Sequence, residues 1–359
     1  MAKSIDINHI AKMAGVSRST VSRVLTNSIN VKAETADKIR EAMLHCNYKP
    51  NPMARGLVTG KINIIAVVVS DITIPFYSEL VALVCSHLKE RGYLVCLHNF
   101  GNVGGDNDEY LETLCKYGFA GIIIADARND PAFATILKAA HCPVVLLNRY
   151  IETVLGYDSI MIDNFLGGYM ATKHLLELGH RSIAMLTGPG KSTSSSDRHK
   201  GYLQALSDYN VMPNKSLIVE GDLLHASGFN FANMLFKDNS RKCSAIFAGS
   251  DIMAIGIMSR CHEMGVRIPE DVSLVGFDDI PMAGTSQVNL TTVQQPTVQL
   301  GSLVAEQIDA RIKGDDGLRQ RITLVPKLII RSTTGKYDSP EFSIVFPANQ
   351  CGAGSPVFL

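Results

Sequence analysis

The chain of 359 residues has no tryptophan, only 7% aromatic residues and no net formal charge. It also lacks a long apolar run, since its longest purely aliphatic stretch is Ile64–Val69 and a membrane span needs roughly 18 residues. The first ten residues, MAKSIDINHI, contain neither the apolar region nor the cleavage site of a signal peptide. These absences predict a soluble, cytoplasmic protein without a membrane partner.

Closely spaced cysteine pairs are also missing. The eight cysteines lie more than four positions apart from one another, which argues against a zinc ribbon or a thioredoxin-type redox pair. In a long cytoplasmic chain we expect reduced, mostly buried thiols. No metal site is predicted.

The composition itself is that of a folded protein. Hydrophobic residues make up 46% of the chain and charged residues 19%, which is too apolar for a disordered polymer. At roughly 150 residues per domain, the length suggests two or three domains.

The zero net charge conceals an uneven distribution. The first 61 residues carry ten basic and four acidic side chains, a net charge of +6, and the remainder therefore carries −6. A short basic segment before a long acidic one indicates a head that binds a polyanion.

The basic head has the pattern of three short helices. Asp6 can cap the first helix, Gly15 can form a tight turn, and Ser17 can cap a second helix. That second helix turns Val21, Val24 and Leu25 inward and Arg18, Ser19, Ser22 and Arg23 outward. The pattern is typical of a helix-turn-helix motif, although an ordinary three-helix piece with a charged solvent face would look the same.

Two segments carry a family resemblance. Residues Ile10–Leu25, IAKMAGVSRSTVSRVL, and Tyr48–Leu57, YKPNPMARGL, closely resemble the LacI/GalR family of bacterial transcriptional repressors, and the likeness extends to about Thr334. The resemblance implies that Arg18 and Ser19 read bases, with Arg23 as a further major-groove contact. Thr20 and Ser22 would contact phosphates, which set the register on DNA.

The second segment resembles the family's hinge helix, which folds on operator DNA. Asn51 can cap it, Arg55 is a further predicted DNA contact, and Leu57 matches the leucine that opens a minor-groove base step. A plain linker with an incidental leucine is the alternative. We predict a DNA-binding domain at 1–49, the hinge at 50–61, a two-lobed core at 62–334 and a C-terminal tail at 335–359.

After Lys61 the sequence alternates between β-rich runs and amphipathic helices. This order predicts an α/β core of two doubly wound lobes with parallel sheets, similar to a periplasmic binding protein. The expected strands are Ile64–Val69, Leu94–His98, Gly121–Ala125, Val144–Asn148, Ser182–Thr187, Ala245–Ala248 and Ser273–Gly276. The expected helices are Phe76–Arg91, Asp106–Tyr117, Gly167–Leu178, Arg198–Tyr209 and Asp251–Met264.

Enzyme motifs fail on their spacing. The TGPGKS segment, Thr187–Ser192, has Met185 where a P-loop needs glycine, and Val266 breaks a zinc-protease-like pattern that begins at His262. We therefore predict no catalytic residue and no cofactor.

Polar residues near strand ends are the candidate effector contacts, because open α/β sheets bind ligands there. The family resemblance adds positions that match its effector loops, and the predicted set is Ser70, Phe76, Asn148, Arg149, Arg198, Asp251 and Asp278. Asp251 and Asp197 could instead be helix caps. Leu223 lies where relatives often have an aromatic stacking platform, which leaves the ligand's identity open.

These observations predict a ligand-responsive repressor of a carbohydrate-utilisation operon. A sugar or sugar derivative bound between the lobes would release a homodimer from a pseudo-palindromic operator. A purine or nucleoside corepressor is the alternative within the family. Two rivals from other classes are a periplasmic sugar receptor, disfavoured by the basic head, and a sugar-active or nucleotide-dependent enzyme, disfavoured by the broken motifs.

Overall fold

A computed structural model describes residues 6–25, 31–48, 63–100, 107–125, 127–152, 156–237 and 242–337. The predicted hinge with Asn51, Arg55 and Leu57 lies outside the described residues, as does the tail from 338 onward. The chain divides into two compact units. Unit 1 comprises residues 1–164, 188–197 and 295–327, and unit 2 comprises 165–187, 198–294 and 328–359.

The head folds as the predicted three helices, α1 (Ile7–Met13), α2 (Arg18–Leu25) and α3 (Ala33–His45). Asp6 caps α1 by accepting a hydrogen bond from the His9 amide at 2.9 Å, and Gly15 adopts a φ of 65° in the turn. Ile10, Val21 and Ile39, one from each helix, form the centre of a small apolar core. The short helices therefore owe their stability to this shared core rather than to their length.

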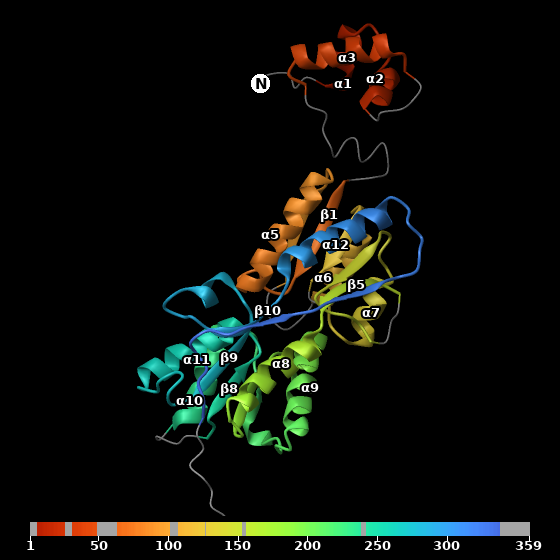
Figure 1. Cartoon of the computed structure of the whole chain (residues 1–359). Coiled ribbons are helices and arrows are strands. Elements are labelled where there is room, and N and C mark those ends of the chain that lie inside the picture. Colours follow the sequence, from red (N-terminus) through yellow and green to blue (C-terminus); the bar gives the residue numbers. More distant parts are fainter. Residues whose placement is uncertain are drawn as a thin grey trace, which may run out of the picture. The chain divides into compact units, whose positions relative to one another are not determined.

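Unit 1 contains a six-stranded sheet in the order β11-β5-β4-β3-β1-β2, and every neighbouring pair is parallel. Helices α6 and α7 pack on one face of this sheet, and α5 and α12 pack together on the other (Figure 1). Its elements are β1 (Ile64–Val69), α5 (Pro75–Glu90), β2 (Leu94–Asn99), α6 (Asn107–Lys116), β3 (Gly121–Ile124), α7 (Pro131–Leu137), β4 (Val144–Leu147), β5 (Asp158–Ile162), α12 (Thr297–Ile312) and β11 (Arg321–Leu324).

Unit 2 contains a second six-stranded sheet in the order β12-β10-β9-β8-β6-β7. Helices α10 and α11 lie together on one side, and α8 and α9 lie on the other (Figure 1). Its elements are α8 (Asn164–Glu177), β6 (Ile183–Thr187), α9 (Thr193–Asp208), η1 (Lys215–Leu217), β7 (Ile218–Glu220), α10 (His225–Phe236), β8 (Ala245–Ala248), α11 (Asp251–Glu263), β9 (Ser273–Asp278), η3 (Pro281–Gly284), β10 (Thr291–Gln294) and β12 (Lys327–Ile329). The predicted fold class, a helical head with two parallel α/β lobes, is confirmed.

One predicted boundary is wrong in a way that matters for the site. Helix α9 begins at Thr193, so Asp197 and Arg198 lie inside the helix and do not open it. The serine-rich start provides the reason, because the Ser192 hydroxyl accepts a hydrogen bond from the Ser195 amide at 3.3 Å and so acts as an earlier cap.

Within the described ranges, no helix is long and apolar enough to cross a membrane. The same ranges hold no cluster of three or more histidine, cysteine, aspartate or glutamate side chains that could bind a metal ion.

Candidate DNA-binding surface and effector site

Helix α2 presents the polar face that the sequence predicts. Val21 is fully buried and anchors the helix, while Arg18, Ser19 and Arg23 are exposed. The Ser17 hydroxyl accepts a hydrogen bond from the Thr20 amide at 3.2 Å, which caps the helix and leaves its first turn at the surface. Thr20 and Ser22 are half-buried at the sides of this face. Their roles on DNA stay predictions.

Three of the four acidic residues of the head make contacts away from α2. On α3, Lys38 pairs with Glu34 at 2.9 Å and Arg40 pairs with Asp37 at 2.7 Å. Asp6 is the cap of α1, and the His9 amide lowers the pKa of its carboxyl. The face of α2 is therefore basic without an acidic side chain on the same helix, which suits contact with phosphates.

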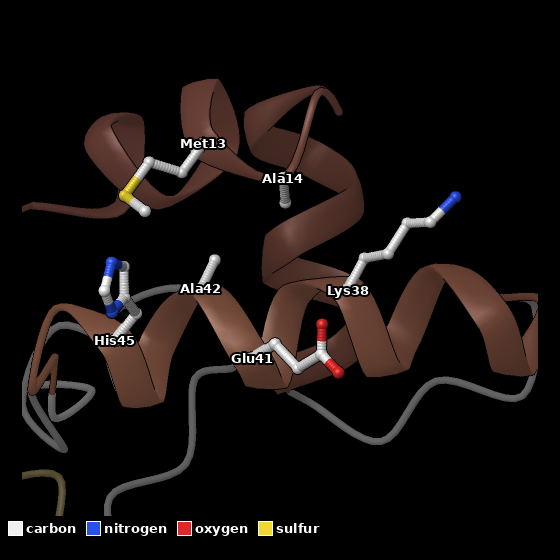
Figure 2. A pocket seen from close by; sticks show the side chains of 6 residues that line it. All are labelled: Met13, Ala14, Lys38, Glu41, Ala42 and His45. Atoms are coloured by element: carbon white, nitrogen blue, oxygen red, sulfur yellow. The ribbon is translucent and has the colours of Figure 1, made fainter.

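A separate pocket of about 350 Å³ lies between α1 and α3. Figure 2 shows its lining side chains, Met13, Ala14, Lys38, Glu41, Ala42 and His45. None of the predicted base or phosphate contacts lines this pocket, so it is distinct from the α2 face.

In unit 1 the four predicted effector residues follow two strands or begin a helix. Ser70 follows β1 and is half-buried, and Phe76 is buried in the first turn of α5. Asn148 and Arg149 follow β4, and both are buried. The Asn148 Oδ1 atom is buried without a hydrogen-bond partner, so it has an acceptor to offer a ligand. Arg149 Nη2 donates to the Tyr77 hydroxyl at 3.4 Å.

In unit 2 the structure brings Arg198 and Asp278 together at the carboxyl ends of β8 and β9. Arg198 is 5% exposed, and its guanidinium lies 3.6 Å from the centre of the Phe277 ring. Its Nη1 donates to the Gly249 carbonyl at 2.6 Å, and its Nη2 lies 3.8 Å from Asp278 Oδ1. A buried guanidinium held in this way is preorganised to donate to ligand oxygens.

Close contact between α8 and α9 fixes the backbone at Arg198. A β-carbon at Gly168 would overlap the Arg198 carbonyl, so only glycine permits this approach of the two helices. Packing of α8 against α9 therefore positions the arginine that the sequence singles out.

Asp251 differs from the other predicted contacts because its side chain is completely buried within unit 2. Its side chain is 0% exposed, and its two oxygens accept from the Ile280 amide at 2.9 Å and the Thr292 hydroxyl at 2.5 Å. Burial, with the neighbouring Asp278 carboxylate, raises the pKa of Asp251 well above its usual range. A direct ligand contact from Asp251 does not fit this geometry, and the cap of α11 is Ser250.

One residue at this edge, Arg331, was not among the predicted contacts. Arg331 donates to Asp279 at 2.6 Å, although 52 residues separate them along the chain. An arginine in a C-terminal segment gives no local signal of such a contact, because only the sheet brings the two residues together.

Comparisons with known proteins decide the family. Residues 6–51 match the family described as "Bacterial regulatory proteins, lacI family", and residues 172–334 match the periplasmic binding protein-like domain. The chain is 32% identical to the HTH-type transcriptional repressor PurR of Vibrio atlanticus over 328 residues, covering 91% of this chain and 98% of that protein. It is 31% identical to the regulator DegA of Bacillus subtilis, with coverage of 91% and 97%. The chain belongs to the LacI/GalR family.

Solved structures of LacI-family proteins agree over the same length. A lac repressor dimer bound to operator and an anti-inducer superposes with a TM-score of 0.81 at 28% identity, covering 93% of this chain and 100% of that one. A complex of the regulator CelR with cellobiose gives 0.69 at 30% identity, with coverage of 92% and 99%. This LacI-family chain is therefore a DNA-binding transcriptional repressor.

Proposed function

We propose that this repressor binds its operator through α2 and is released from it by a sugar or sugar derivative. The proposal of an effector rests on the buried pair of Arg198 and Asp278 at the carboxyl ends of two strands of unit 2. Arg198 Nη2 lies 3.8 Å from Asp278 Oδ1. A guanidinium beside a carboxylate offers donors and an acceptor to the hydroxyl groups of one ligand. In unit 1, Asn148 Oδ1 is a buried acceptor without a hydrogen-bond partner.

For operator binding, Arg18 and Ser19 are proposed to read bases, and Arg23 is proposed to add a major-groove contact. Thr20 and Ser22 are proposed to bind phosphates. The exposure of the α2 face and the pairing of Glu34 and Asp37 with cations on α3 support this assignment. We propose a DNA-binding domain at 1–49, a hinge at 50–61 that binds the minor groove, a core at 62–334 and a tail at 335–359.

A sugar is favoured over a purine by Leu223. This residue is half-buried with a φ of 67°, and it offers no aromatic face on which a flat base could stack. The known complexes of similar proteins include one with cellobiose and one with bound ribose. A purine or nucleoside corepressor remains the second candidate because several similar repressors are named PurR.

We also propose that the repressor acts as a homodimer, in line with the lac repressor dimer on its operator. In unit 1 the edge strand β2 leaves Leu94 60% and Leu97 41% exposed. A second copy covering this strand would bury these apolar side chains, and a two-fold dimer would read a pseudo-palindrome. No catalytic role is proposed.

The test begins with a thermal-shift screen of the full chain against cellobiose, ribose, hypoxanthine and guanosine. Operator DNA is selected from a random pool with the ligand-free protein, and its affinity is measured by fluorescence anisotropy with and without each compound. We expect a sugar that raises the melting temperature and weakens operator binding. Tighter operator binding in the presence of a purine would favour the purine corepressor over the sugar. If neither sugars nor purines changed operator affinity, control by these two classes of effector would be overturned.

A further inference from the structure

Two successive non-glycine residues at the end of β9 adopt positive φ angles. Asp278 has a φ of 116° and Asp279 a φ of 58°. Among the described residues they are the one adjacent pair of this kind outside glycine. Such backbone costs free energy and persists only where the surroundings impose it, often at a ligand site.

The first restraint comes from Asp251. Its Oδ2 accepts from the Ile280 amide, one residue beyond the strained pair, and its Oδ1 accepts from Thr292. On the other side of the pair, a β-carbon at Gly276 would overlap Asp251 Oδ1. The buried Asp251 side chain therefore contacts the chain both before and after the strained pair.

The second restraint comes from Arg331. Its Nη2 donates to Asp279 Oδ1 at 2.6 Å, and its Nη1 donates to the Leu290 carbonyl at 2.7 Å. Gln294 Nε2 donates to the other Asp279 oxygen at 2.8 Å. The side chain of Arg331 is 18% exposed, so this forked contact is largely shielded from water.

What the two restraints hold in place is the environment of Arg198. Phe277 and Asp278, the last two residues of β9, supply the ring and the carboxylate that face its guanidinium. If this strand end moved, Arg198 would lose both contacts and keep its bond to Gly249.

We infer that Asp251 and Arg331 are positioning residues of the effector site, which hold Asp278 in its strained conformation and thereby fix Arg198. The inference rests on the proposed function for the role of Arg198 and Asp278. It gives a function to Arg331, in the segment that follows β12.

The central experiment compares Arg331→Gln with Arg267→Gln in the full chain. Arg267 lies in the same unit and also pairs with an aspartate, Asp271 at 3.0 Å, but its side chain is 68% exposed. Each protein is treated with phenylglyoxal, which reacts with accessible guanidinium groups, and modification of Arg198 is followed by mass spectrometry. This readout needs no ligand, so it stands even if every compound in the screen fails.

We expect Arg198 to react at least tenfold faster in Arg331→Gln and at the wild-type rate in Arg267→Gln. Arg331→Lys, which keeps a charge for Asp279, should restore part of the protection. An unchanged rate in Arg331→Gln would overturn the inference.

Hydrogen exchange separates positioning from general loss of structure. In Arg331→Gln and in Asp251→Asn, faster exchange should be confined to the peptide covering residues 276–280, and β8 should keep its protection. Equal loss of protection across unit 2 would show that these residues stabilise the fold as a whole and would contradict the positioning role.

Discussion

The polar groups of the head and those of the two core units lie in opposite surroundings. Arg18, Ser19 and Arg23 are exposed on α2, whereas Arg198, Asp251 and Asp278 are buried in unit 2. Exposed cations can meet a polyanion at little desolvation cost. Buried groups must be held by fixed partners, since an unpaired polar group inside a protein is costly.

This difference separates two modes of recognition. The head offers exposed cationic side chains to DNA, and the attraction between these cations and the phosphates contributes to binding. The proposed effector site of unit 2 offers a guanidinium and a carboxylate whose positions are fixed by contacts within the protein. Substitutions of buried charged groups in the α/β core should therefore affect folding strongly, and substitutions of exposed charged groups in the head should affect it weakly. The following predictions test that contrast.

The largest effect is expected for Arg311→Met in unit 1. Arg311 Nε and Nη2 bind both oxygens of the buried Asp158 at 2.8 and 2.9 Å, and Nη1 donates to the carbonyls of Asp315 and Gly317. Removing the cation leaves the buried Asp158 carboxylate with only the Gln320 amide at 2.8 Å and the exposed Arg319 at 3.3 Å. The free energy of unfolding should fall by about 3–5 kcal/mol.

Urea unfolding of the full chain measures this change. Lys313→Met is the matched control. Lys313 directly follows α12, the helix that contains Arg311, and it also pairs with an aspartate, Asp309, but its side chain is 69% exposed. Equal losses in the two variants would contradict the contrast between buried and exposed charge.

The second effect is a pH dependence that His180 imparts to unit 2. His180 is 2% exposed, and its ring nitrogens contact the hydroxyls of Ser244 and Ser273 at 3.0 Å. Burial lowers its pKa from 6.5 to about 4. Between pH 6.5 and pH 4 the unfolded chain therefore carries a proton on His180 that the folded chain does not. The contribution of His180 to the free energy of unfolding is complete above pH 6.5 and decreases as the pH falls toward 4.

The predicted loss is on the order of 3 kcal/mol across this interval. When the melting temperature is measured from pH 7 to pH 4, His180→Gln should remove the part of its pH dependence that His180 causes. His45→Gln, which changes an exposed side chain of the head, should leave the slope as it is. A wild-type slope in His180→Gln would disprove the assignment.

The head was largely predictable from the sequence because its determinants are local. The Asp6 cap, the Gly15 turn and the inward Val21 all follow from residue type and helical spacing. In the core, buried strands such as β1 and β3 were predicted, while β5, β10, α7, α10 and α12 were missed.

The unit 2 site was predictable only in part, because its determinants are distant in sequence. Arg198 and Asp278 stood out as polar residues near strand ends, and the sheet brings them together. The distinction between Asp278 and the wholly buried Asp251 depends on Ile280 and Thr292. No spacing rule connects those residues, so their hydrogen bonds could be found only in the folded chain.

A smaller effect, on binding rather than folding, is expected for Arg18→Ala. The exposed side chain contributes little to the head's core, so the melting temperature should stay unchanged. Affinity for the selected operator should fall by about 1–3 kcal/mol, with relaxed preference at one base pair.

Binding to a panel of single-base-pair operator variants measures this preference, with Arg40→Ala on α3 as the control. Arg40 pairs with Asp37 and is 63% exposed. If Arg18→Ala weakened all sequences to the same degree, Arg18 would be a phosphate contact and would not read bases.

The smallest effect is expected for Lys38→Ala, which removes an ion pair from the head. Lys38 and Glu34 are 60% and 82% exposed, so water screens their attraction and ordering the two side chains offsets most of the gain. We expect no measurable change in melting temperature at 0.15 M salt, and none at 1 M salt. A clear loss at low salt that disappears at high salt would show that exposed pairs do support the head's fold. The distinction between a head built for contact and core units built around buried charge would then have to be abandoned.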